Sequence, residues 1–128
     1  MSDAERELHA AVKTISAETL VSAWQRNRLA FWQEYEGIWK VTGTAVRIEG
    51  DERRPVLILA GTAGGGRTRV RCQFPSAVDS PSVWGKLTKV SAGDYLAVIG
   101  SMWSWTQLDL DETDCAVVVG AFDLWRGE

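Results

Sequence analysis

The feature that constrains the fold of this chain most is an alternating run over residues 67–74, with arginines at 67, 69 and 71 and apolar residues at 70, 72 and 74. Successive side chains of a β-strand point to opposite faces, so Arg67, Arg69 and Arg71 would share one face. The other face is apolar and holds Val70, Cys72 and Phe74. The pattern predicts a strand that buries one side in a core and presents cations on the other.

The segments around this strand also carry β signals. Alternating or apolar runs bounded by turn residues predict strands over residues 38–48, 55–60, 95–101 and a split segment, 108–110 with 115–119. Gly43, inside the first of these, predicts a bulge or a sharp bend. Residues 75–92 contain a short apolar pattern suited to a brief helix.

The ends of the chain are expected to differ from this β region. Residues 1–14 lack strong periodicity and are interpreted as a frayed helix or a tail. A single helix is predicted over 15–36, because Ser16 is a good N-cap and Leu20, Phe31 and Tyr35 follow at helical spacing. Gly37 would end that helix, which would pack on the sheet. Residues 37–120 would form the main domain, and 121–128 a C-terminal tail.

Five strands with a helix between the third and the fourth describe a mostly β protein of OB-fold type. The predicted architecture is a five-stranded Greek-key barrel, preceded by the N-terminal α-helix. An SH3-like barrel and an unrelated α+β sheet are the alternatives.

The order and spacing of short hydrophobic pieces from about Ile15 to Val119 resemble the tRNA_anti-like family of OB-fold proteins. The pieces include Val41-Thr42-Gly43 and Gly93-Asp94. The resemblance implies an OB barrel behind a helix and no catalytic residues, and nucleic-acid binding is implied from the fold. This chain departs from the family pattern in its richness in tryptophan and in the acidic stretch 111–114.

Size and composition favour a single ordinary domain. The chain has 128 residues, of which 45% are hydrophobic, and no apolar run approaches the roughly 20 residues that span a bilayer. Neither a membrane segment nor a signal peptide is recognisable, so we expect a soluble, cytoplasmic protein. Cys72 and Cys115 are interpreted as buried thiols, with a disulfide between them or a reactive role as the alternatives.

Charge is divided unevenly along a chain whose net charge is −3. Residues 37–89 carry nine lysines and arginines against four acidic residues, whereas residues 90–128 carry one against seven. This asymmetry indicates a basic face. The face would include Arg67, Arg69 and Arg71, because OB-folds commonly bind oligonucleotides across their second and third strands.

Two loops are expected to extend that face. Arg47, Arg53 and Arg54 border the loop between the first two predicted strands, although acidic residues interleave with them. Trp103 and Trp105 lie in the loop between the last two strands and would point the same way, as a platform for stacked bases. Packing of these indoles within the protein, or against a partner protein, is the alternative.

Other motifs point away from catalysis and metal binding. The acidic set Asp109, Asp111, Glu112 and Asp114 lacks the glycine and the distal glutamate of a calcium loop. The glycine-rich segment 61–66 lacks the ending of a phosphate-binding P-loop. His9 is the only histidine, and we therefore expect no metal, no cofactor and no enzymatic activity.

The sequence thus favours a non-enzymatic module that binds single-stranded nucleic acid weakly and with little sequence preference. The eight candidate residues are Arg47, Arg53, Arg54, Arg67, Arg69, Arg71, Trp103 and Trp105. The alternative is a protein-interaction module or homo-oligomer that uses exposed tryptophans. The overall acidity and the acidic stretch, which would repel phosphate near the arginines, favour that alternative.

Overall fold

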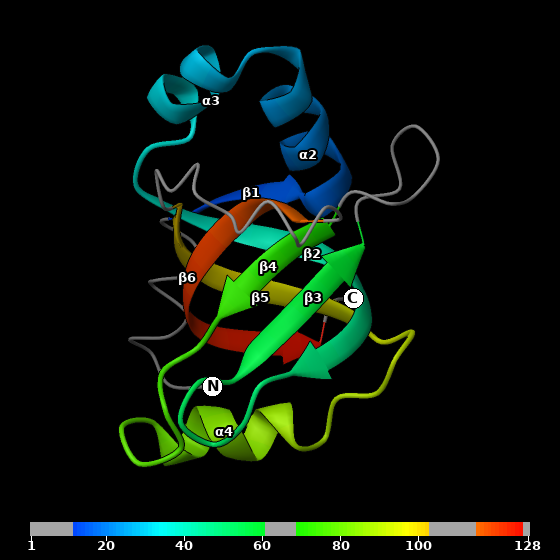
Figure 1. Ribbon diagram of the computed structural model, residues 1–128, viewed down its shortest axis with the longest axis vertical. Coiled ribbons are helices and arrows are strands. Elements are labelled where there is room, and N and C mark those ends of the chain that lie inside the picture. The colour runs from blue at the N-terminus through cyan, green and yellow to red at the C-terminus, as the bar shows by residue number, and fades with distance from the viewer. Residues whose placement is uncertain (1–11, 61–68, 103–114, 127–128) are drawn as a thin grey trace.

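The computed structural model describes residues 12–60, 69–102 and 115–126 (Figure 1). In these ranges it has six strands: β1 (Lys13–Ser16), β2 (Ile38–Glu49), β3 (Val56–Ala60), β4 (Arg69–Gln73), β5 (Tyr95–Met102) and β6 (Cys115–Arg126). Its helices are α2 (Ala17–Arg26), α3 (Arg28–Glu34) and α4 (Pro81–Leu87).

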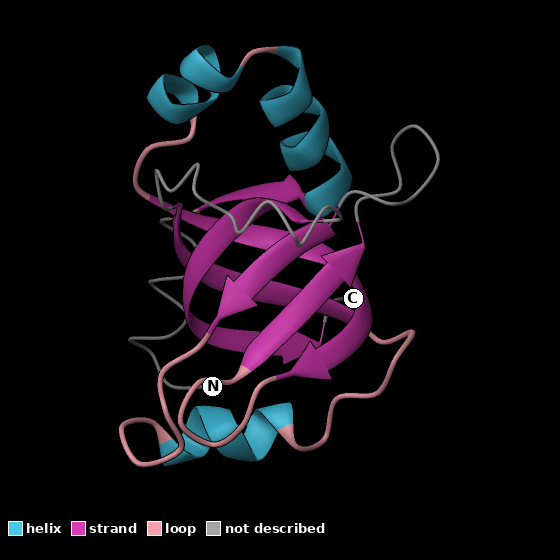
Figure 2. Ribbon diagram, in the orientation of Figure 1, coloured by secondary structure: helices cyan, strands magenta, loops and turns pink. Residues whose placement is uncertain are grey.

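The strands form one sheet that closes into a ring. Their order is β1-β2-β3-β4-β6-β5, and β2 pairs with β5 as well, which joins the two ends. The ring is not a regular barrel, because the first half of β2 pairs with β1, whereas its second half pairs with β3. Figure 2 shows α2 and α3 at one end of the ring and α4 at the other.

The core lies inside the ring and continues under the N-terminal helices. Val70 and Cys72 of β4 are fully buried, together with Leu57 and Leu59 of β3. Helices α2 and α3 add Leu20, Val21 and Phe31 to the same cluster, and α4 adds Val83 and Leu87. The sheet turns other side chains outward. Of these, Arg71 and Gln73 are partly exposed, whereas Val56 and Ile58 are buried in a second, small cluster.

The predicted alternation of the arginine strand is confirmed over the part that the structure describes. Val70, Cys72 and Phe74 are buried, whereas Arg69 and Arg71 lie on the opposite face and are partly exposed. The hairpin of β3 and β4 is also confirmed, as is the short helix before β5. Cys115 lies outside the side chains described.

Two segments expected to lie outside the sheet belong to it, and one of them adds a sixth strand to the five that were predicted. Residues 13–16 pair in parallel with β2, so part of the expected tail and the start of the expected helix form β1. Strand β6 runs to Arg126 and pairs with β5 over residues expected to form a C-terminal tail. Pairing in the sheet gives the backbone N–H and C=O groups of both segments hydrogen-bond partners in the protein. In an isolated tail these groups would bond to water instead.

The single N-terminal helix was also predicted wrongly, because Asn27 interrupts it. Ser16 caps α2 as expected, since its Oγ accepts a hydrogen bond from the backbone N–H of Thr19. Asn27 is extended, with φ −160°, and its side chain accepts hydrogen bonds from the N–H groups of Leu29 and Ala30. An asparagine that caps a new helix in this way ends the preceding one.

Strand β2, the first strand of the closed ring, has its bulge just beyond Gly43. The register of β2 against β3 shifts between Ala45 and Arg47. Gly43 has a different role, because a Cβ there would approach the Cβ of Ala17 to 3.0 Å. The glycine therefore lets the start of α2 pack closely on β2.

No helix in the described ranges is both long and apolar enough to cross a membrane.

The close contact between β5 and β6 at Gly100 gives a stability prediction. A Cβ at this position would lie too close to the backbone oxygen of Gly120 for the two strands to keep their spacing. We expect Gly100→Ala to lower the free energy of unfolding by about 1–3 kcal/mol, measured by urea denaturation. Gly85→Ala is the control, because a Cβ at Gly85 meets nothing within 4 Å and alanine is favoured inside a helix. An unchanged stability of Gly100→Ala would contradict the packing.

Candidate functional site

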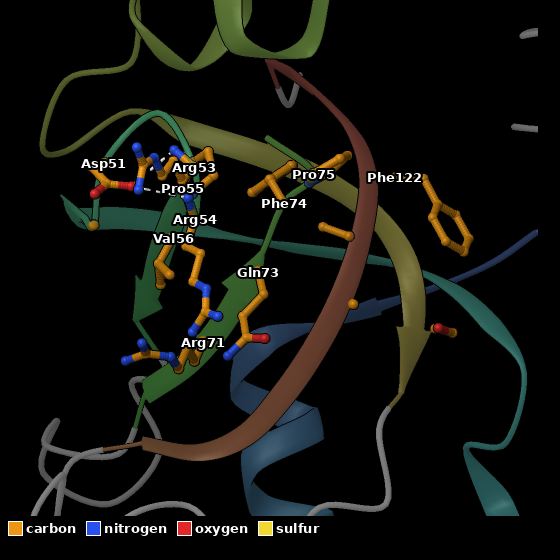
Figure 3. Close-up of a pocket in the computed structure, with 14 residues that line it drawn as sticks. Asp51, Arg53, Arg54, Pro55, Val56, Arg71, Gln73, Phe74, Pro75 and Phe122 are labelled. Atoms are coloured by element: carbon orange, nitrogen blue, oxygen red, sulfur yellow. Dashed lines mark hydrogen bonds between the residues drawn. The ribbon is translucent and has the colours of Figure 1, made fainter. Parts of the chain in front are cut away.

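A pocket of about 960 Å³ lies against the ring, between the β2–β3 loop and strand β6 (Figure 3). Strands β3 and β4 contribute Val56, Arg71 and Gln73 to its lining, and the loop contributes residues 50–51 and 53–55. These strands are the second and third of the closed ring. The pocket therefore occupies the surface on which OB-folds commonly bind oligonucleotides.

Strand register explains which residues meet in the pocket. Val56 pairs with Gln73, Gln73 with Gly120, and Gly120 with Ser101. Paired residues on neighbouring strands point to the same face of a sheet. One row therefore crosses β3, β4, β6 and β5, and all four of its residues line the pocket.

The loop between β2 and β3 supplies two exposed arginines, Arg53 and Arg54. Oδ1 of Asp51 accepts hydrogen bonds from their backbone N–H groups, at 2.8 Å and 3.1 Å. Gly50 allows the turn, because its φ is +80°. The carboxylate of Asp51 thus holds the backbone of the loop, and the two guanidinium groups remain at the surface.

The carboxylate of Glu49 lies between two further arginines. Its Oε1 contacts Nε of Arg47, and its Oε2 lies 3.6 Å from Nη1 of Arg71. The side chain of Arg71 is 19% exposed, against 44% for Arg47. Glu49 therefore offsets part of the positive charge of this face at the edge of the pocket.

Apolar and aromatic side chains complete the lining. Phe74 is buried, whereas Phe122 of β6 is 49% exposed. In Figure 3, Arg54, Arg71 and Gln73 lie on one side of β6 and Phe122 lies on the other. The pocket thus has a cationic side and an aromatic side, which is the combination that binds phosphates and stacks bases.

The structure brings together three of the eight predicted site residues. Arg53, Arg54 and Arg71 line the pocket, whereas Arg47 and Arg69 do not. Arg69 lies on the same face as Arg71, beside Ala60. Arg67, Trp103 and Trp105 lie outside the described residues, as do the glycine-rich segment 61–66 and the acidic set of residues 109, 111, 112 and 114.

Sequence reasoning missed Gln73 and Phe122. Gln73 belongs to the alternating strand and lies on its arginine face, so the same parity argument could have included it. Phe122 was placed in a tail, although the apolar run from Cys115 through Leu124 could have extended the last strand. Among the described residues, no group of three or more His, Cys, Asp or Glu side chains could hold a metal ion.

The strand order, the closure of the ring and the helix between its third and fourth strands define an OB-fold-like protein. The chain belongs to the tRNA_anti-like family, whose model matches residues 2–108. The suspected resemblance is thereby confirmed. No curated protein matches the chain.

Three solved structures with a similar fold have low sequence identity. A Klebsiella pneumoniae lipoprotein proposed to bind nucleic acid is 14% identical, with a TM-score of 0.62 over 100% of this chain and 99% of that one. A chain of the S. pombe Stn1-Ten1 complex is 18% identical, with a TM-score of 0.56 over 75% and 68%. The OBody AM1L10, bound to hen egg-white lysozyme, is 12% identical, with a TM-score of 0.56 over 73% and 81%.

Proposed function

We propose that this protein is a non-enzymatic module that binds single-stranded nucleic acid in the pocket between the β2–β3 loop and β6. The observation that carries the proposal is the presence of three arginines and one exposed phenylalanine around the same pocket. Guanidinium groups suit phosphate oxygens. An aromatic ring stacks on a base only when that base is not paired in a duplex.

Two comparisons agree with this proposal. The family to which the chain belongs has an OB-fold-like architecture, and one protein of similar fold, the Klebsiella lipoprotein, is itself proposed to bind nucleic acid. In the proposed complex, Arg53, Arg54 and Arg71 hold phosphates and Phe122 stacks on a base. Arg69 would extend the binding surface along β4. Arg67, Trp103 and Trp105 remain candidates outside the described residues.

A protein ligand is the alternative, since the OBody of similar fold was solved bound to lysozyme. The C-terminal Trp125 is half-buried, and Nζ of Lys86 lies 5.2 Å from its ring centroid. This contact makes Trp125 a poorly accessible anchor for a protein partner. Concentration-dependent light scattering, without any binding of oligonucleotides, would favour a self-associating module instead.

Removal of the loop arginines tests the phosphate contacts. We expect Arg53→Ala/Arg54→Ala to weaken binding of a fluorescein-labelled single-stranded oligonucleotide in anisotropy titrations at several salt concentrations. The slope of log K against log salt should become shallower by about 0.7 for each phosphate that the variant no longer neutralises. Arg26→Ala/Lys89→Ala removes the same charge from exposed positions outside the pocket and should leave the slope almost unchanged. Wild-type protein that binds nothing at ~50 mM salt would refute the proposed function.

Truncation of Phe122 tests stacking. We expect Phe122→Ala to weaken oligonucleotide binding by about 1–3 kcal/mol, with little change in folding stability because the ring is half exposed. Tyr95→Ala is the matched control, since Tyr95 is 47% exposed and does not line the pocket. Equal weakening in the two variants would count against a stacking role for Phe122.

Neutralisation of Glu49 tests whether it competes with phosphate for Arg71. We expect Glu49→Gln to tighten oligonucleotide binding by up to about fivefold, because a partly exposed ion pair is worth up to about 1 kcal/mol. The salt dependence should become steeper. Glu52→Gln, which neutralises an exposed acid of the same loop outside the pocket lining, is the control. Weaker binding by Glu49→Gln would show that Glu49 positions Arg71 rather than competes for it.

A further inference from the structure

Gln73 provides the pocket with an amide whose hydrogen-bonding groups are available. The pocket lining contains two uncharged polar side chains, those of Gln73 and Ser101. The Gln73 side chain forms no hydrogen bond within the part of the chain that the structure describes. A side-chain amide carries two donor hydrogens and an acceptor oxygen, so this half-buried group can both donate to a ligand and accept from it.

The residue next to Gln73 in this row is a buried glycine, Gly120, which adds no side chain to the pocket lining. Gly120 pairs with Gln73 across β4 and β6, and it pairs with Ser101 across β6 and β5. Two strand spacings, about 9–10 Å, therefore separate Gln73 from Ser101, and the residue between them has no side chain. We call the part of the pocket between the amide of Gln73 and the hydroxyl of Ser101 the slot.

Groups suited to a nucleotide surround the slot. Arg54 and Arg71 lie on the same side of β6 as Gln73 (Figure 3), where they can hold a phosphate beside the amide. Phe122 follows Gly120 by two residues and borders the other side of the pocket. A base in the slot could stack on that ring and present its edge to Gln73.

We infer that Gln73 reads the edge of one base, so that this surface binds adenine-containing single strands in preference to those of cytosine or thymine. The inference rests on the proposed function. A glutamine amide pairs with adenine through two hydrogen bonds, because it accepts from the N6 amino group and donates to the adjacent ring nitrogen. The arginines bind phosphates of any sequence, so Gln73 supplies the selectivity.

Titrations with homo-oligonucleotides test the inference in the full-length protein. Wild-type protein should bind dA12 about 5- to 100-fold more tightly than dC12 or dT12, which is the discrimination of one two-bond pair. Gln73→Ala should bring that ratio close to one and change the affinities for dC12 and dT12 little. Gln33→Ala, at an exposed position of α3, should keep the wild-type ratio.

Gln73→Glu keeps the shape of the side chain but removes its donor. Because a carboxylate accepts a hydrogen bond from the N4 amino group of cytosine, the preference should move from dA12 towards dC12, even if the added charge weakens all binding. A wild-type protein that binds the three oligomers equally, or a ratio preserved in Gln73→Ala, would overturn the inference. Failure to bind any oligomer would instead refute the proposed function of the surface.

Discussion

The double pairing of β2 is the constraint on which the rest of this structure depends. Residues 44–49 of β2 pair with β3, and residues 38–44 pair with β5, which closes the ring. Closure fixes the register of every strand between these two neighbours. A slip of one residue in β4 would turn Val70 outward and Arg71 inward. The placement of the cations thus depends on the same pairing that buries the core.

The local part of this architecture could be predicted from the sequence, because a strand that separates core from solvent must alternate. The alternation around Val70 and Cys72 and the short helix before β5 are signals within a few neighbouring residues. The interruption at Asn27 could not be seen in this way, since its spacing also fits the apolar stripe of a continuous helix. Only its backbone conformation shows that the side chain caps a second helix.

The candidate site could be predicted less well, because it is built from pairings between segments distant in the sequence. Nothing in the sequence indicates that β6 lies parallel to β4 and brings Gly120 beside Gln73. The loop arginines were a weak signal, since Asp51 and Glu52 interleave with them. The structure separates these charges in part: Asp51 bonds to the loop backbone, whereas Arg53 and Arg54 line the pocket.

An acidic chain can still present a surface for phosphate, because screening limits the reach of exposed charges to about 8–10 Å. Charges nearer than that distance decide the local field, and around the pocket they include three arginines, Asp51 and Glu49. Glu49 offsets part of the charge of Arg71, because its Oε2 lies 3.6 Å from Nη1 of that guanidinium. In the proposed complex, contacts between arginine and phosphate carry no information on the base, so discrimination among bases must come from uncharged groups such as Gln73.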